Sequence, residues 1–455
     1  MPTAWRRGVL AAAVLLAAGG AQAQSLHEVL AQALQSDATW RAAQAQAASV
    51  PYKVEQARAA LRPQLGLTGS ATVQAAETPD SQTAKSAQKL GLALGVSAQQ
   101  SLYNRASSLT VEKAQRGQDI ARATLEAARQ DLIQRVSQAY FDVLTAQSAV
   151  RALESALDAA QGQLKFATRN FEVGNATVTD SRQAQAQVDV LQAQLLSARN
   201  TVQTRQLALA QITGQADVTP WELKPTALAD KNSMLAVRPE TVDEWVALAE
   251  SLSPAVQQAA LAAQSAELDV ALARAQDAPT LALVGQVGVA RDQSRSRVPG
   301  AGWVSGSARS GTGQVGVNFN MPLYTGGLND NRLRETLALL DAARQQQEAA
   351  RRSVTQATRT AFYTLRSTQA QALALRTAVS SAELLLKAAR LGYEVGMNTS
   401  LDVLNAQNQV YQTRRDLDQA RYGALSAYLG LRRAAGAITD QDLAELDDRL
   451  QPAKP

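Results

Sequence analysis

Four segments of the chain alternate strictly between apolar and polar residues. Alternation with a period of two over about ten residues is typical of strands that have one apolar and one polar face. Segments of about this length are also long enough to cross a bilayer as tilted strands. The pattern therefore predicts strands at about 64–76, 90–103, 280–290 and 313–324.

The two faces of these strands carry different side chains. We expect the apolar face to meet lipid, because Gly, Ser, Gln and Asn on the other face are typical of the wet interior of a barrel. The edge of a soluble sandwich would show the same alternation, and a slip of one residue would invert the register. The positions predicted to face lipid are Leu92, Leu94, Val317 and Phe319, and those predicted to face the lumen are Gln314, Asn318 and Asn320.

A long helical hairpin follows each pair of strands. Residues 106–172 contain no Pro, and apolar residues recur every seven positions from Val136 to Phe171. A heptad pattern with small residues three positions later is typical of closely packed, antiparallel coiled-coil helices. We expect the two hairpins at about 106–213 and 328–435.

The chain is an internal duplication. The stretch "FEVGNATVTD" (171–180) is repeated 222 residues later as "YEVGMNTSLD", and "SLYNRA" is matched by "PLYTGG". The offset changes only across 77–89 and 291–312, which we therefore expect to be loops. The predicted divisions are a signal peptide (1–23), a first repeat (24–214), a linker (215–240), a second repeat (241–436) and a C-terminal tail (437–455).

The first 23 residues have the features of a secretory signal peptide. Arg6 and Arg7 precede an apolar run that ends in Ala21-Gln22-Ala23, an A-x-A cleavage site. We therefore expect the mature chain to begin at Gln24, outside the cytoplasm.

The composition argues against an enzyme. The chain has no Cys and one His, His27, so it offers no thiol nucleophile, disulfide, Cys-based metal site or His-pair zinc site. Gly-rich phosphate loops and nucleophile elbows are also missing from the sequence. We expect no cofactor and no metal. The net charge of +5 is dispersed among acids along the helices, which argues against a nucleic-acid surface.

Four strands cannot close a barrel, and open sheet edges are not tolerated in lipid. The barrel must then close by self-association of several chains. Two copies would supply eight strands, whose interior side chains fill, whereas three copies would supply twelve strands around a lumen. We therefore predict a homotrimer. Its fold class is a mixed all-α and β-barrel membrane protein with two internal repeats and four transmembrane strands per chain.

This duplicated plan of strand pair and long hairpin, together with "PLYTGG" and the two Gly-centred tips, resembles the TolC-type outer-membrane efflux and secretion channels. The resemblance covers about residues 26–440. It implies a trimer in the bacterial outer membrane whose helices form a periplasmic tunnel. The implied partners are a periplasmic adaptor (a membrane fusion protein) and an inner-membrane ABC or proton-driven transporter. The cargo, small toxic compounds or proteins, stays open.

Without a Cys to carry a lipid anchor, the chain resembles the unlipidated branch of this family. The alternative function is a secreted or surface coiled-coil structural protein without a pore. The four strands argue against it, because a structural rod needs none.

The resemblance also assigns roles to two groups of residues. Asp402 matches the first acid of a ring at the periplasmic constriction, and Tyr393 is expected to reach Asp180 across the closed mouth. An Asn stands where Arg is expected, which predicts a loosely held mouth with weak block by multivalent cations. The constriction residues are Asp180, Thr179, Tyr393, Asn398, Asp402 and Asn405, and the adaptor-docking tips are Val173, Gly174, Asn175, Val395, Gly396 and Met397.

A simpler role is open to the same tip residues. The spacing of Thr177 and Asp180, and of Thr399 and Asp402, is that of a helix N-cap with an acid in the first turn. A Gly before such a cap is ordinary helix-ending chemistry. Capping and gating can both hold.

Overall fold

The computed structural model describes residues 24–77, 86–174, 177–215, 218–224, 227 and 237–452. The predicted signal peptide lies outside these residues. The chain divides into two compact units, which we call the sheet unit and the hairpin unit. The sheet unit comprises Gln46–Arg122 and Gln258–Gln347, and the hairpin unit comprises Met1–Ala45, Ala123–Gln257 and Glu348–Pro455.

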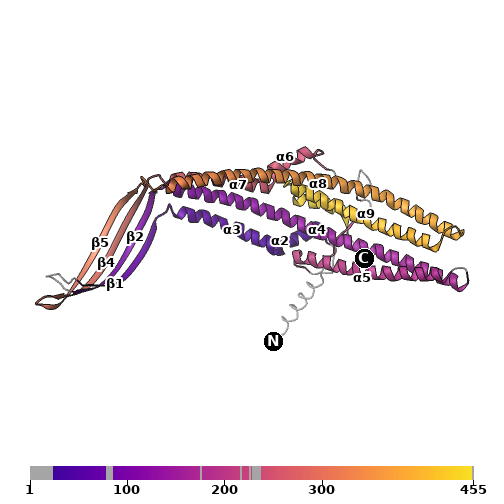
Figure 1. Cartoon of the computed structure of the whole chain (residues 1–455), viewed down its shortest axis with the longest axis horizontal. Helices are drawn as coiled ribbons and strands as arrows, with labels where there is room; N and C mark the ends of the chain where they lie inside the picture. Colours follow the sequence, from indigo (N-terminus) through magenta and orange to yellow (C-terminus); the bar gives the residue numbers. More distant parts are fainter. Residues whose placement is uncertain are drawn as a thin grey trace, which may run out of the picture. The chain divides into compact units, whose positions relative to one another are not determined.

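The sheet unit contains one four-stranded antiparallel sheet in the order β1-β2-β4-β5 (Figure 1). Its strands run Gln64–Glu77 (β1), Ser86–Tyr103 (β2), Thr280–Val298 (β4) and Gly302–Asn320 (β5). The pairing of β2 with β4 joins the two sequence repeats in one sheet. The end of β1 at Glu77, the start of β2 at Ser86 and the turn between β4 and β5 therefore lie at one end of the sheet, which we call the turn end. The strand ends that lead to helices lie at the other.

The expectation of a loop over 291–312 is wrong. Strands β4 and β5 stay paired up to Val298 opposite Gly302, and Gly300 takes a positive φ of 84° in the turn. The ladder outlasts the apolar alternation, because beyond Val289 polar residues predominate on both faces. At its other end β5 stops at Asn320 rather than at 324, before Pro322, which lacks the N–H that a ladder requires.

The helices fall into long outgoing and shorter returning pairs. The 68-residue α4 is followed by α5, and the 67-residue α8 is followed by α9. No helix among the described residues is both long and apolar enough to cross a bilayer. The helices are α2 (Leu26–Ser36), α3 (Ala38–Ala59), α4 (Arg105–Glu172), α5 (Val178–Thr213), α6 (Val242–Leu252), α7 (Pro254–Ala275), α8 (Leu328–Glu394), α9 (Ser400–Ala434) and α10 (Asp440–Asp447).

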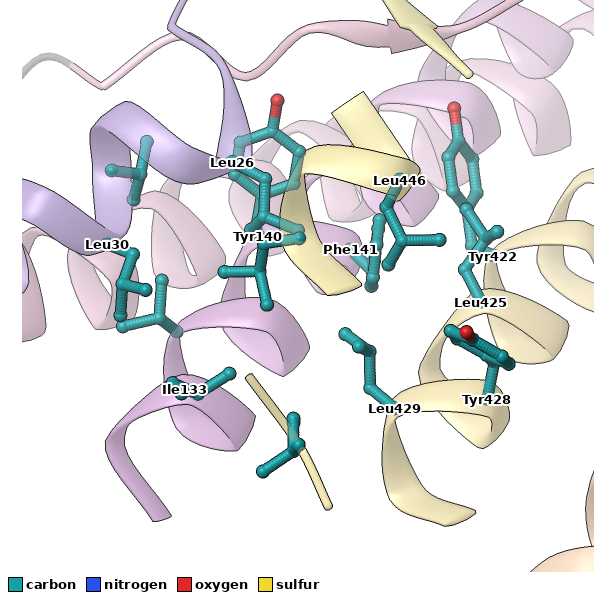
Figure 2. Packing of buried hydrophobic residues seen from close by; sticks show 14 of the residues in the cluster. Leu26, Leu30, Ile133, Tyr140, Phe141, Tyr422, Leu425, Tyr428, Leu429 and Leu446 are labelled. Carbon is teal, nitrogen blue, oxygen red and sulfur yellow. The ribbon is translucent and has the colours of Figure 1, made fainter. Parts of the chain in front are cut away.

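The core of the hairpin unit gathers α2, α4, α9 and α10 (Figure 2). Side chains from all four helices meet there, among them Leu30, Tyr140, Leu429 and Leu446. Asp447 of α10 accepts hydrogen bonds from the first backbone N–H groups of α2, at 2.8 and 3.0 Å. The two-residue strands β3 (Glu222–Leu223) and β6 (Leu450–Gln451) also pair. The C-terminal tail is thus part of this core.

Several heptad positions of α4 are buried. Val136 and Val143 are fully buried, and the small residues Ala146, Ala160 and Ala167 are buried as well. These positions therefore form a buried stripe along α4, as expected for a heptad pattern with one face in contact with other helices.

Candidate functional site

The strand register sorts the alternating residues onto two faces of the sheet. Cross-strand partners point to the same side, and Leu67, for example, pairs with Val96, which pairs with Val287. We call this side the apolar face and the opposite side the polar face. The apolar face carries Leu65, Leu67, Val73, Leu90, Leu92, Leu94, Val96, Leu281, Leu283, Val287, Val289, Val315, Val317 and Phe319.

All four residues predicted to face lipid lie on the apolar face and are exposed in the single chain. The residues predicted to face the lumen, Gln314, Asn318 and Asn320, lie on the polar face. The register therefore separates the two groups as the sequence pattern requires. That the apolar face meets lipid stays a prediction.

The outer edges of this sheet are β1 and β5. Each edge strand presents backbone N–H and C=O groups that have no partner within the four-stranded sheet. Such edges are templates for pairing with another chain. The sheet as it stands in one chain is an open fragment, and it can close only against further copies.

Each long hairpin ends in a glycine turn that displays apolar side chains. Gly174 and Gly396 adopt positive φ angles of 82° and 77°, a conformation that residues with a Cβ rarely take. Val173, Val395 and Met397 are 62%, 63% and 83% exposed. The sixth predicted tip residue, Asn175, lies outside the described residues.

Both returning helices begin with the capping arrangement predicted from the sequence. The Thr177 hydroxyl and backbone N–H donate to the Asp180 carboxylate at 2.7 and 3.0 Å, and the Asp180 N–H donates back to the hydroxyl at 3.3 Å. Thr399 and Asp402 repeat this geometry at 2.7, 2.8 and 3.2 Å. The capping interpretation is confirmed at both tips.

The electrostatic consequence is clearest at Asp402. The hydrogen bonds from the Thr399 hydroxyl and backbone N–H hold the pKa of the Asp402 carboxyl below its ordinary value, because they favour the charged form. Asp402 and Asn405 are both exposed on α9. Asp402 thus presents a stable negative charge beside the tip of the second hairpin.

The structure does not bring Tyr393 and Asp180 into hydrogen-bond contact. The Asp180 carboxylate is occupied by Thr177, and within the described part of the chain no hydrogen bond of the Tyr393 hydroxyl is found. The Tyr393 ring instead packs edge-on against Phe166 of α4, with ring centres 5.9 Å apart. It also lies against the small apolar cluster around Val403. Its contact with the first hairpin is aromatic.

Asn398 is used within its own hairpin. Its side-chain amide donates to the Ala389 carbonyl at 3.3 Å. A Cβ at Gly392 would lie 2.5 Å from the same amide nitrogen, so the absence of a side chain there makes room for Asn398. Thr179, the remaining predicted constriction residue, is exposed near the start of α5.

Two polar contacts between the hairpins were missed by the sequence analysis. Gln163 of α4 donates to the Ser400 hydroxyl at 3.0 Å, and Gln187 of α5 donates to the Asn408 side chain at 3.1 Å. A Gln on a helix surface fits solvent equally well, so the sequence held no signal for either. With the Phe166–Tyr393 pair they join the two hairpins.

Comparison with known proteins matches this geometry to one family. The model of the outer membrane efflux protein family matches residues 29–215 and 245–437. The chain is 29% identical to outer membrane protein TolC of Vibrio cholerae, over 95% of each chain. It is 28% identical to alkaline protease secretion protein AprF of Pseudomonas aeruginosa, over 69% of this chain and 63% of that protein.

A solved structure shares the fold. The outer membrane protein VceC from Vibrio cholerae superposes with a TM-score of 0.74, at 22% identity, over 90% of this chain and 96% of that one. Channels of this family are trimers that work with efflux-pump partners. A pore-less coiled-coil structural protein is thereby excluded. The chain belongs to the outer membrane efflux protein family, and it is a non-enzymatic outer-membrane channel for efflux or secretion with a periplasmic helical extension.

Proposed function

We propose that three copies of this chain close one twelve-stranded barrel, with β1 of each copy pairing with β5 of the next. The two unpaired edges of the sheet support this arrangement. The apolar face then meets outer-membrane lipid and the polar face lines the lumen. Pairing of β1 with β5 gives the backbone N–H and C=O groups of both edge strands hydrogen-bond partners, which a lipid environment requires.

The hairpin tips are proposed to dock a periplasmic adaptor, which links the duct to an inner-membrane ABC or proton-driven transporter. The observation that carries this proposal is the exposure of the apolar side chains of Val173, Val395 and Met397. The helices that follow these turns are capped by their own Thr and Asp residues, so the exposed side chains are not needed for capping. Apolar side chains that gather on an exposed surface are typical of protein–protein interaction sites. The absence of Cys supports membership of the unlipidated branch.

The mouth of the duct is proposed to lie where the hairpins meet. Three copies of Asp402 and Asn405 would surround the axis, and the Gln163–Ser400, Gln187–Asn408 and Phe166–Tyr393 contacts would hold the second hairpin against the first. The proposed cargo is small toxic compounds or proteins. The similarity to a protein named for alkaline protease secretion favours testing secreted proteins as cargo alongside small compounds.

Charged substitutions at the tips test the docking proposal. Val173→Asp and Met397→Asp should abolish export in cells that depend on this channel, while trimers assemble normally. Neither side chain is buried, so the fold of the tip does not depend on them. Leu196→Asp on α5, where Leu196 is 69% exposed away from the tips, serves as the matched control. Normal export by both tip variants would refute adaptor docking there.

A further inference from the structure

A band of arginines continues the apolar face towards the turn end of the sheet. Arg291 of β4 lies directly opposite Arg309 of β5, two positions beyond Val289 on the same face. Further along the face, the Arg295 guanidinium lies over the Trp303 ring, 5.2 Å from its centre. We call Arg291, Arg295, Arg309 and Trp303 the basic band.

The described residues do not neutralise the positive charge of this band. Like charges directly opposite each other on neighbouring strands are destabilising, yet none of the three arginines forms an ion pair among the residues that the structure describes. The acid nearest in sequence, Asp292, lies on the polar face and pairs with Lys89 at 2.9 Å. The described part of the chain thus leaves these guanidinium groups open to an anionic ligand.

A hollow of about 810 Å³ adjoins the Arg291–Arg309 pair on the apolar face. Leu92, Leu94 and Val289 line it. Gly311 also lines the hollow and deepens it, because it has no side chain and no other atom fills the space where a Cβ would stand. The complementary ligand is therefore amphipathic, with an anionic group for the arginines and an apolar part for the hollow.

The height of the arginine pair fits a membrane interface. Ten residues separate Leu281 from Arg291 on β4, and ten separate Phe319 from Arg309 on β5. At about 3.3 Å per residue and a tilt of about 40°, these stretches rise about 25 Å, the thickness of the apolar band of a membrane barrel. An arginine at the midplane would be costly, whereas at the interface it costs little.

We propose that the basic band binds the phosphorylated headgroup of a membrane lipid, whose acyl chain lies in the hollow beside Leu92 and Leu94. This inference rests on the proposed orientation of the apolar face towards lipid. The helical extension is periplasmic and joins the sheet at the end away from the turns, so the lipid belongs to the outer leaflet. Two guanidinium groups can each form paired hydrogen bonds with phosphate oxygens, which a lysine cannot do.

Lipid selectivity of the full-length trimer in nanodiscs tests the proposal. Phosphatidylcholine nanodiscs would carry a trace of nitroxide-labelled phosphatidic acid or, in parallel, labelled phosphatidylcholine, and the spectrum gives the fraction of label immobilised by the protein. The wild type should prefer phosphatidic acid. Arg291→Gln with Arg309→Gln should lower that preference by about 10- to 30-fold, the effect typical of removing two basic residues from an anionic lipid surface.

Three variants separate the site from general effects. Lys89→Gln with Asp292→Asn removes two charges close by on the polar face and should keep the preference. Gly311→Leu fills the hollow with the arginines intact and should weaken it. Arg291→Lys with Arg309→Lys should give an intermediate value, because the charge remains without the paired geometry.

The outcomes also separate this inference from the proposed duct. Equal preference in the wild type and the double Gln variant overturns the lipid site, as does release of the labelled lipid by an equal concentration of inorganic phosphate, which would indicate a free-anion site. The same preparations are examined in planar bilayers. If the wild type conducts but shows no lipid preference, only the proposed lipid site is rejected. If the wild type never conducts, the proposed duct is rejected.

Discussion

At the scale of single residues, the ring of Tyr393 carries the contact that its hydroxyl was expected to make. The family resemblance implied a hydrogen bond from the Tyr393 hydroxyl to Asp180, which Tyr393→Phe would remove. The structure instead shows edge-on packing against Phe166. We therefore expect Tyr393→Phe to leave the open fraction in single-channel recordings unchanged and Tyr393→Ala to raise it.

The magnitude follows from the aromatic pair. Such a pair contributes about 0.5–1.5 kcal/mol beyond its buried area, so Tyr393→Ala should raise the open fraction about 2- to 10-fold. Phe166→Ala should have a similar effect, and the double variant should add little to either single one, because both remove the same contact. Additive effects would show that the two rings act independently of each other.

Whether the role of a residue could be predicted from the sequence depended on how local its interaction is. The caps at Thr177 and Thr399 follow from a spacing of three residues, so the sequence alone predicted them correctly. Asn398 was expected to act across the mouth, but the space left by Gly392 turns it towards Ala389 of its own hairpin. Such a choice depends on tertiary packing, which a motif does not encode.

At the scale of elements, the strands and long helices were predictable from the sequence wherever one face of the element is apolar. The alternation identified all four strands and their faces, and the absence of Pro indicated an unbroken α4. It failed over residues 291–312, since the ladder between β4 and β5 continues with polar side chains on both faces. Backbone pairing holds these residues in strands, and a hydrophobic pattern cannot report it.

A pair of neighbouring substitutions tests which face of β5 meets lipid. Val315, 81% exposed on the apolar face, lies near the middle of the proposed apolar band, and Gln314 lies next to it on the polar face. Val315→Arg should destabilise the assembled barrel by about 2–4 kcal/mol, whereas Gln314→Arg should cost far less. The measurement is the yield of heat-modifiable trimer in the outer membrane. Equal yields, or a larger loss for Gln314→Arg, would mean that the orientation is wrong.

At the scale of the whole molecule, the single chain supplies every part of the duct except closure. Its sheet ends in two free edges, and its tips each present one cap and one acid. In the proposed trimer, symmetry would convert these single features into rings: the pairs of edges would form a closed barrel, and three copies of Asp402 would place three carboxylates around one axis. A ring of this kind attracts cations and repels anions.

The pH dependence of cation block tests whether that ring forms. Hydrogen bonds from Thr399 lower the pKa of Asp402 within one chain and oppose the rise that repulsion between three neighbouring carboxylates would cause. The carboxylate is therefore charged at neutral pH and loses its charge in acid. Block by a multivalent cation, recorded from single channels, should therefore persist at neutral pH and disappear in acid. Thr399→Ala removes the hydroxyl that favours the charged form, so it should move the midpoint of this loss to higher pH.

The two capping boxes supply a matched control for the ring. Asp402→Asn should abolish the block at every pH, while Asp180→Asn breaks the equivalent cap of the first hairpin and should leave the block in place. The proposed ring is rejected if both variants reduce the block equally, because loss of a helix cap, which both variants share, would then explain the effect. It also fails if neither does, since Asp402 would then act only as the cap of α9, and the cations would bind elsewhere in the duct.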